Sequence, residues 1–487
     1  MFKKILLILL GAVLMLLTIL LVNTFRLDNK QVEPGERTET EWDGDAIVDR
    51  FSRAIQYQTI SGDMDDERNT EEFYSFLDFI EEEYPLFHSR LEQTMFSDLT
   101  PLYFWEGSDP SLDPILLMGH YDVVPVDSTD LEHWQYAPFS GEIEDGYIWG
   151  RGTLDNKNNV MALLETAEHL LQNDFRPQRS IYFIFGHDEE IGGYDGAVYA
   201  SRYFQDQDIR FYYVLDEGGV IIDDLLPVDK PVAIIGVAEK GYLSLELIAR
   251  SVGGHSSMPP ADKSVVKLSE AIVRLDNNPL PARIDGATEL MFDALGNKLP
   301  FSMRMLYANR WLTEGTIIRE MSKDAATSAL IRTTMAPTML RAGVKDNVLP
   351  TQARGVVNFR LLPGDDFDTI KNHVRNTIED ESIEIQRYST IESQASMVSS
   401  VTGTAYRTLQ QTITDYYQDV YVAPYIVVGA TDSRHFIPVA DNVYRFSPVH
   451  VSMGETNLVH GINERIRVDS YLDAVGFYTE LIRRTTE

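Results

Sequence analysis

The sequence predicts an α/β fold into which a smaller domain is inserted. Three apolar runs have the composition of buried strands and lie at 115–118, 180–185 and 211–215. The first is followed, between Val160 and Leu171, by apolar residues at helical spacing. Residues 240–392 instead follow the order β-α-β-β-α-β, which is typical of a ferredoxin-like domain. We therefore expect one α/β domain built from residues 44–239 and 393–487, with residues 240–392 forming a lid above it.

The N-terminus carries a membrane-targeting segment. After Lys3 and Lys4, the 18 residues Ile5 to Val22 are apolar and uncharged, which is near the lower limit for a helix that spans a bilayer. A cleaved signal peptide has a shorter apolar region and small residues before the cut, and residues 21–26 offer no such site. We expect residues 1–26 to be an uncleaved, single-pass signal anchor with its basic end inside, and secretion after cleavage is the alternative.

Residues 27–43 are polar and predict a disorder-prone tether between this anchor and the rest of the chain. The remaining 444 residues would then lie outside the cytoplasm. The whole chain of 487 residues is long enough for about two to three domains.

Composition excludes some classes of function. A formal net charge of -33 argues against nucleic acid as a partner, because phosphate binding needs a local excess of Lys and Arg. Without any cysteine, the chain has no disulfide and no thiolate nucleophile. A catalytic site must therefore use oxygen and nitrogen groups.

Several segments of the inserted domain have clear periodicity. The expected strands and helices lie at 243–249, 264–275, 355–361, 366–378 and 383–387, in that chain order.

The first candidate for chemistry is the pair His120 and Asp122, which follows the apolar run at 115–118. Side chains two apart on an extended segment point to the same side, so Asp122 could brace the ring of His120 while the other ring nitrogen holds a metal. Taken alone, a histidine near a strand end is more often a hydrogen-bonded loop residue.

Two further carboxylate motifs strengthen the metal hypothesis. Asp155 precedes the helix predicted from Val160 and could also be a simple N-cap. Glu189 and Glu190 follow the run at 180–185 and precede glycines that let the backbone approach closely. Because consecutive side chains diverge, one glutamate can bind a metal while its neighbour faces the substrate. The alternative for this pair is a solvated acidic loop tip.

Asp216 follows the run at 211–215, and His460 lies far away near the C-terminus. Two histidines and three carboxylates form an all-nitrogen and oxygen set that suits zinc, cobalt or manganese. Five ligands exceed the needs of one catalytic zinc, but they suit two metals bridged by one carboxylate.

The ordered series HxD, GRGxxD, EExGG, an aspartate after a further strand, and NxxHGxNE resembles the dinuclear zinc exopeptidases of peptidase family M20. The match covers roughly residues 45 to 485. Members include aminoacylase, glutamate carboxypeptidase and yeast carboxypeptidase S. Residues 120–125 and 151–155 look like the versions of these motifs found in the Gly-Xaa carboxypeptidase and N-fatty-acyl amino acid synthase/hydrolase group.

The resemblance implies a zinc-peptidase-like catalytic domain with two divalent metal ions, zinc in the first place and cobalt or manganese as alternatives. It implies that Asp155 bridges the metals, that Glu189 is the general base and that Asp122 supports His120. The remaining ligands it implies are His120 and Asp216 on one metal, and Glu190 and His460 on the other.

In the lid, the resemblance assigns substrate binding to His255, Asn347 and Arg360. The histidine would polarise the scissile carbonyl, often from the partner subunit of a homodimer, and the other two would bind the terminal carboxylate. An arginine suits a carboxylate because it can donate two parallel hydrogen bonds, although a surface ion pair is its more usual fate. Arg434 is a weaker candidate for the same pocket.

Residues 279–327 do not fit the short lid of the family and look like an insertion rich in apolar residues. Extra core or an oligomer contact is the usual reason for such density, and a groove for an acyl chain is the alternative.

These observations predict a metal-dependent hydrolase that cleaves the amide bond of N-acyl amino acids or removes the C-terminal residue of short peptides. The reverse reaction, a condensation that would synthesise N-acyl amino acids, stays open. The competing predictions are a di- or tripeptide aminopeptidase and a noncatalytic binding module of the cell envelope.

Overall fold

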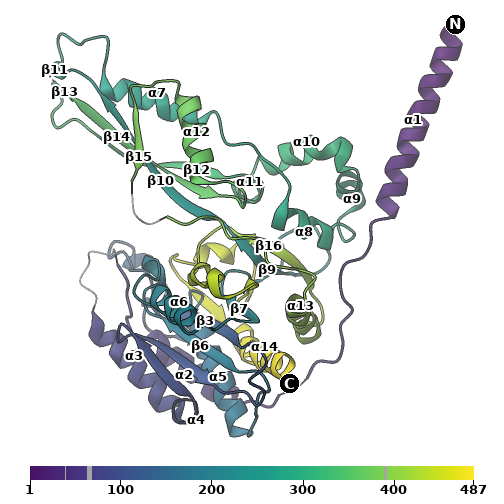
Figure 1. Ribbon diagram of the computed structural model, residues 1–487, viewed down its shortest axis with the longest axis vertical. Coiled ribbons are helices and arrows are strands. Elements are labelled where there is room, and N and C mark those ends of the chain that lie inside the picture. Colours follow the sequence, from purple (N-terminus) through teal and green to yellow (C-terminus); the bar gives the residue numbers. More distant parts are fainter. Residues whose placement is uncertain (39, 63–68, 389–391) are drawn as a thin grey trace.

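The computed structural model describes residues 1–38, 40–62, 69–388 and 392–487. Figure 1 shows an α/β body, an inserted domain above it and a long N-terminal helix, α1 (Phe2–Phe25), that projects away from both. By length and composition α1 can cross a membrane, and its most apolar window is not buried against the body.

A ten-stranded sheet forms the centre of the body. Its main path is β1 (Glu92–Phe96), β2 (Thr100–Trp105), β6 (Ile181–Gly186), β3 (Ile115–His120), β7 (Tyr213–Asp216), β17 (Val443–Arg445), β9 (Val232–Glu239), β8 (Ile221–Ile222) and β18 (His450–Val451), with β16 (Tyr421–Val427) also paired to β9. The three expected strands are β3, β6 and β7, and β3 runs parallel to both of its neighbours.

Both faces of this sheet are buried, which explains why its central strands are apolar without alternation. Ile115 and Leu117 belong to a core shared with helices on one face, and Leu116 and Met118 belong to a second core on the other. The first core includes α2 (Gly44–Ile55), α3 (Thr70–Glu83), α4 (Pro85–Arg90), α5 (Lys157–Gln172), α13 (Thr404–Tyr417) and α14 (Val468–Thr486). The second includes α6 (Ala197–Asp206) and the 3₁₀ segment η3 (Asp432–Val439).

The inserted domain has the expected ferredoxin-like arrangement. Its antiparallel sheet has the order β12 (Thr334–Ala342), β14 (Gln352–Leu361), β10 (Gly241–Arg250) and β15 (Glu384–Arg387). Helices α7 (Ser264–Asp276) and α12 (Phe367–Ile378) contribute Leu268 and Ile370 to a core with Leu247 and Phe359 of the sheet. A two-stranded tip, β11 (Gly254–His255) with β13 (Val348–Leu349), lies at the far end from the body (Figure 1). The predicted α/β fold with an inserted β-α-β-β-α-β domain is confirmed.

Between α7 and β12 the chain forms four helices, α8 (Gly286–Leu295), α9 (Phe301–Ala308), α10 (Arg310–Met321) and α11 (Ala325–Ile331). Met291 and Phe292 of α8 are buried, and they join the core of the body rather than the core of the inserted domain. Much of the apolar density predicted for residues 279–327 is therefore extra core.

The segment after α1 is docked on the body, which corrects the expectation of a disorder-prone tether. The side-chain amide of Gln31 donates to the carbonyls of Ala294 (2.9 Å) and Val422 (3.0 Å) and accepts from the Val422 N–H (2.8 Å). Further along, the Gly35 N–H donates to Asp415 (2.6 Å) and Arg37 pairs with Asp473 (3.0 Å). These contacts hold the segment across α8, β16, α13 and α14.

Candidate metal centre

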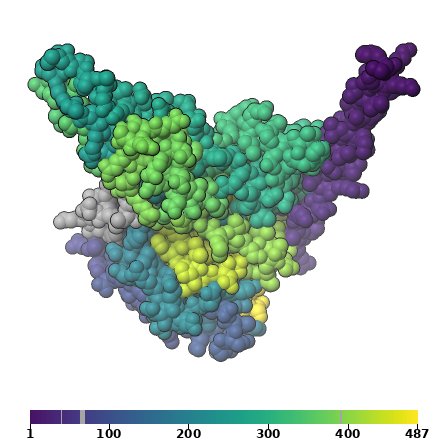
Figure 2. Space-filling view, turned by 45° about the horizontal axis from the view of Figure 1, so that its top comes forward, coloured from purple at the N-terminus to yellow at the C-terminus, as the bar shows by residue number. Residues whose placement is uncertain are grey.

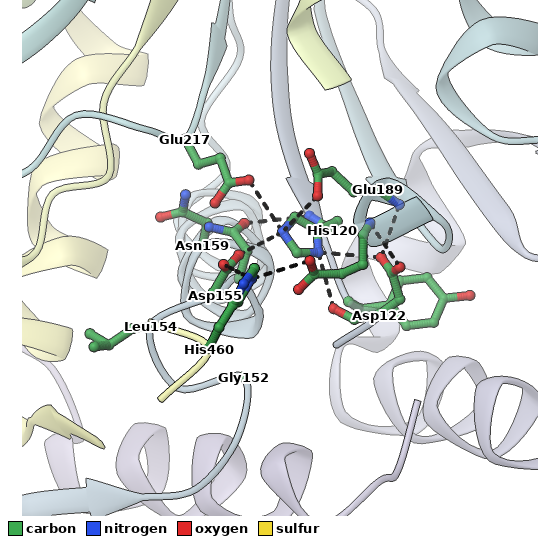
Figure 3. A network of polar contacts seen from close by, with 12 residues as sticks. His120, Asp122, Gly152, Leu154, Asp155, Asn159, Glu189, Glu217 and His460 are labelled. Atoms are coloured by element: carbon green, nitrogen blue, oxygen red, sulfur yellow. Dashed lines mark hydrogen bonds and ion pairs between the residues drawn. The ribbon is translucent and has the colours of Figure 1, made fainter. Parts of the chain in front are cut away.

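The residues of the candidate site gather where three neighbouring strands end. His120 is the last residue of β3, Glu189 and Glu190 follow β6, and Glu217 follows β7 directly. Parallel strands bring their carboxyl ends to one edge of a sheet, which is where open α/β sheets place their ligands. Asp155, two residues before α5, completes the group at this edge (Figure 3).

Asp155 lies between two histidines that are 340 positions apart in the sequence. Its Oδ1 is 2.9 Å from Nε2 of His120, and its Oδ2 is 2.9 Å from Nε2 of His460. Glu190 Oε2 is 3.2 Å from the same nitrogen of His460. One carboxylate thus faces two sets of nitrogen and oxygen atoms, as expected of a bridging ligand.

Asp122 has two roles in this geometry. Its backbone carbonyl lies 3.0 Å and its carboxylate 3.3 Å from Nδ1 of His120, which directs Nε2 toward Asp155. The same carboxylate accepts the backbone N–H groups of Glu189 and Glu190, each at 3.2 Å. Asp122 therefore fixes the histidine ring and the two-glutamate turn relative to each other.

Asp216 lines the same cavity as His120, but among the described residues it makes no ion pair with either histidine, so its place in the ligand set stays a prediction. Its carboxylate accepts the backbone N–H of Ser433 at 2.9 Å. The next residue, Glu217, instead lies with Oε1 3.2 Å from Nε2 of His120. Strand β7 ends at Asp216, so Glu217 begins the following turn and faces the edge of the sheet.

Glu189 lies beside the two sets of candidate ligands. Its Oε2 is 4.0 Å from Nε2 of His120, farther than the oxygens of Asp155 (2.9 Å) and Glu217 (3.2 Å). The turn after it requires glycine, because Gly193 has φ +68° and a Cβ there would collide with the carboxylate of Asp432. Glu190 faces His460, so the two adjacent glutamates diverge as expected.

The loop that carries Asp155 is fixed by a buried ion pair. Arg151 donates to Glu464 at 2.5 Å and to the backbone carbonyl of His460 at 3.0 Å. Glu464 also accepts the backbone N–H groups of Gly152 (3.0 Å), Leu154 (2.8 Å) and Asp155 (3.3 Å). Arg151 belongs to the GRGxxD motif and Glu464 to the NxxHGxNE motif, but the motifs alone do not indicate that the two residues pair.

Burial and neighbouring charges shift the pKa values of several residues in the site. Burial lowers the pKa of His120, but Glu217, Asp122 and Asp155 outweigh it and raise that pKa well above its usual value. Hydrogen bonds to the carboxylates of Asp155 and Glu190 raise the pKa of His460 to about 10. Burial, followed by the charge of Asp155, raises the pKa of Glu217 to about 8. The carboxylates therefore make a strongly favourable site for positive charge.

The same residues fit a metal ion. Groups of possible ligand atoms include His120 with Asp155 and Glu190, and His120 with Glu189 and Glu217. Within the described part of the chain, the buried Oε1 of Glu190 has no hydrogen-bond partner, and such a carboxylate oxygen suits a cation. Imidazole nitrogens and carboxylate oxygens, without sulfur, are typical ligands of zinc, cobalt and manganese.

Two arginines from separate segments lie near each other, and one of them, Arg434, borders the metal centre. Arg434 donates to the Gly192 carbonyl at 2.9 Å. Burial lowers the pKa of its guanidinium, but the charges of nearby Glu239, Asp432 and Glu189 outweigh burial and raise that pKa. Arg360, on β14, lies with its guanidinium carbon 4.7 Å from the centroid of the Tyr242 ring. Among the described residues, Arg360 makes no side-chain hydrogen bond or ion pair, so the surface ion pair considered for it is not observed.

His255 and Asn347 lie elsewhere. His255 is in β11 and Asn347 immediately precedes β13, at the tip of the inserted domain that Figure 1 shows far from β3, β6 and β7. Both are exposed, and Nδ1 of His255 accepts from Ser257 rather than from any group of the metal centre. A single chain therefore does not bring these two residues to its own site.

Comparison with known proteins agrees with this arrangement. The sequence profile described as "Peptidase family M20/M25/M40" matches residues 116–484. The chain is 39% identical to "Probable carboxypeptidase S-like 2" of Dictyostelium discoideum, covering 96% of this chain and 92% of that protein. It is 37% identical to "N-fatty-acyl-amino acid synthase/hydrolase PM20D1" of Xenopus tropicalis, covering 96% and 93%.

The fold also resembles that of a solved structure from this family. The crystal structure of an M20 family metallo-carboxypeptidase, Sso-CP2 from Sulfolobus solfataricus, superimposes with a TM-score of 0.64 at 20% identity, covering 90% of this chain and 98% of that one. Together with the profile match and the long, similar relatives, this fold shows that the chain belongs to peptidase family M20/M25/M40 and is an enzyme of the metal-dependent amide hydrolase type.

Proposed function

We propose that this enzyme uses two divalent metal ions to hydrolyse the amide bond of N-acyl amino acids or of the C-terminal residue of short peptides. The observation that carries the proposal is Asp155, whose two oxygens each lie 2.9 Å from a different histidine. A carboxylate in that position can bridge two ions. The names of the relatives, which are carboxypeptidase S-like and N-fatty-acyl-amino acid synthase/hydrolase, support these two substrate classes.

The proposed ligand sets follow the geometry rather than the initial prediction. His120 and Glu217 would bind one ion, His460 and Glu190 the other, and Asp155 both. Zinc suits this set best, with cobalt and manganese as alternatives. When bound, the ions would supply Lewis acidity to the amide carbonyl and to the attacking water.

Glu189 is the proposed general base. It lies beside both ligand sets. Burial, with a smaller contribution from neighbouring carboxylates and against the opposing charge of His120, raises its pKa well above its usual value. A carboxylate of raised pKa can accept a proton from the attacking water at neutral pH. Glu189 would then transfer that proton to the nitrogen of the leaving amine, so one side chain acts as base and then as acid.

The proposed substrate contact is between Arg360 and the free α-carboxylate. A partly buried guanidinium without an anionic partner is suited to binding one, and Arg434 adds positive charge nearby. Both proposed substrate classes have this carboxylate. An aminopeptidase would instead need an acidic group placed to bind a free amine, and it is the alternative activity, while a noncatalytic binding module is the alternative outside enzymes.

His255 and Asn347 would act from the partner subunit of a homodimer. Their exposed position at the far tip of the inserted domain is the reason for this proposal. In that arrangement the histidine of one chain would polarise the scissile carbonyl in the site of the other.

The proposed location is a single-pass membrane protein with its catalytic domain outside the cytoplasm. Three observations support an uncleaved anchor: the length of the apolar helix α1, the two lysines in its first turn and the absence of a small-residue cleavage motif in residues 21–26. Release after signal cleavage is the alternative.

The first prediction concerns the general base. Glu189→Gln should retain two metal ions per chain, because it is not a proposed ligand, while kcat falls by about 100- to 10,000-fold because an amide cannot accept the proton. Metal content by mass spectrometry and hydrolysis of an N-acyl amino acid would measure this. The matched control is Glu190→Gln, which should lose metal. Loss of metal in the Glu189 variant alone would mean that the two roles are reversed.

The second prediction separates two adjacent carboxylates. Glu217→Ala should lose one of the two ions, since it removes the carboxylate beside His120. Asp216→Asn should retain both, because its amide oxygen can still accept the Ser433 N–H. Metal titration of both variants is the measurement, and the opposite result would restore Asp216 to the ligand set.

The third prediction tests substrate class. Arg360→Ala should reduce kcat/KM for substrates with a free α-carboxylate, mainly through KM, because losing the partner of a buried charge costs about 2–5 kcal/mol. C-terminally amidated substrates should be poor for the wild type and little affected by the change. Arg354→Ala, on the same strand but paired with Glu246, is the control that should leave both unchanged. Equal hydrolysis of free and amidated substrates by the wild type would favour the aminopeptidase.

The fourth prediction tests the partner contribution. Chains carrying His255→Ala and chains carrying Glu189→Gln should each be inactive, yet a heterodimer of the two should regain activity because one of its sites has both residues. Activity measured on heterodimers purified through two affinity tags would show this. No recovery in confirmed heterodimers would mean that each chain completes its own site.

A further inference from the structure

An exposed apolar surface lies on the insertion, next to the end of the N-terminal helix. It consists of Phe301 and Met303 on α9 and Trp311 and Leu312 on α10, all exposed, with Trp311 64% exposed. These side chains differ from Met291 and Phe292, which the same insertion buries in the core. We call these four residues the α9–α10 apolar surface. The described structure leaves these four side chains exposed, so packing within the chain does not account for their being apolar.

This surface is fixed against the last turns of α1. Asn23 donates to the side-chain oxygen of Asn309 at 2.9 Å, and Asn309 donates to the Leu20 carbonyl at 3.1 Å. The rings of Phe25 and Phe301 have centroids 5.9 Å apart. Figure 2 shows the insertion directly beside the base of the purple N-terminal helix. The junction between α9 and α10 is therefore held at one level of α1.

That level corresponds to the edge of a bilayer. The apolar stretch Ile5 to Val22 has 18 residues, which span about 27 Å as a helix and roughly match a hydrocarbon core of about 30 Å. Leu20 is near the outer end of this stretch. Side chains beside it would lie where hydrocarbon meets the lipid headgroups, the region in which aromatic residues such as Trp are enriched.

The local charge also suits a lipid surface. Five basic residues lie between positions 298 and 323, where Arg310 pairs with Glu289 and Glu314, and Lys323 pairs with Glu320. Among the described residues the other three have no ion pair, in a chain whose formal net charge is -33. The basic residues are Lys298, Arg304, Arg310, Arg319 and Lys323. Apolar side chains beside a local excess of basic residues are typical of helices that lie in the interface of a membrane containing anionic lipids.

We propose that the α9–α10 apolar surface docks into the outer interface of the membrane that α1 spans. The inference rests on the proposed uncleaved anchor and adds a second membrane contact to it. The insertion would thereby seat the body against the bilayer, with Trp311 at the level of the headgroups.

Trp311 provides a direct test. Trp105, Trp134 and Trp149 are buried and Trp42 is half-buried, so Trp311 is the most exposed of the five tryptophans. The full chain would be reconstituted into vesicles of phosphatidylcholine and phosphatidylglycerol, with and without brominated acyl chains. Brominated lipid should quench part of the emission, and Trp311→Phe should lose that quenched part. Trp42→Phe is the matched control and should keep it, because Trp42 packs against His169 on the body.

Iodide in the aqueous phase distinguishes the remaining outcomes. Strong iodide quenching of Trp311 without quenching by brominated lipid would overturn the docking. Protection from iodide without lipid quenching would mean that a second copy of the chain covers the surface, which also overturns it. Intact-mass measurement of the same sample tests the anchor separately: loss of residues 1–26 would overturn the anchor and the docking together, whereas an intact chain without lipid quenching overturns the docking alone.

Discussion

Mutual repulsion between carboxylates is the constraint on which the rest of the site depends. Asp155, Glu189, Glu190 and Glu217 converge on one edge of the sheet, and Asp122, Asp216 and Asp432 lie just behind them. Two like charges 4 Å apart repel by about 4 kcal/mol at the effective dielectric constant of a protein surface. The two histidines and the backbone N–H groups that bond Asp122 and Asp216 offset this repulsion, and the metal ions that we propose for the centre would offset it further.

The fold meets this constraint by fixing each acidic segment from a distant part of the chain. Arg151 connects the loop of Asp155 to both Glu464 and the backbone of His460. At the junction with the inserted domain, the buried pair of Glu239 and Arg445, 2.8 Å apart, balances charge between β9 and β17. A buried pair contributes little net stability, but removing one partner leaves an uncompensated charge. The pairs therefore specify geometry more than they stabilise it.

Much of the fold could be predicted from the sequence because its patterns are local. The strand before His120, the helix after Asp155 and the order of elements in the inserted domain all follow from periodicity within single segments. The choice between Asp216 and Glu217 is less certain for a physical reason. At the end of β7 the alternation of side chains stops, so the sequence alone does not tell whether Asp216 or Glu217 faces the edge; the hydrogen bond to Ser433, which is 217 residues away, decides it. The roles of Arg151 and Glu464, like the docking of Gln31, likewise depend on contacts between segments far apart in the chain.

The docking of the segment after α1 limits how far the body can move relative to that helix. Residues 27–43, if free, would behave as a flexible chain with a root-mean-square length of about 23 Å and would let the body tumble around its anchor. The bonds of Gln31, Gly35 and Arg37 remove that freedom. For a chain held in a bilayer by α1, the body then keeps one orientation, and molecules that partition into the leaflet approach it by lateral diffusion always from the same side.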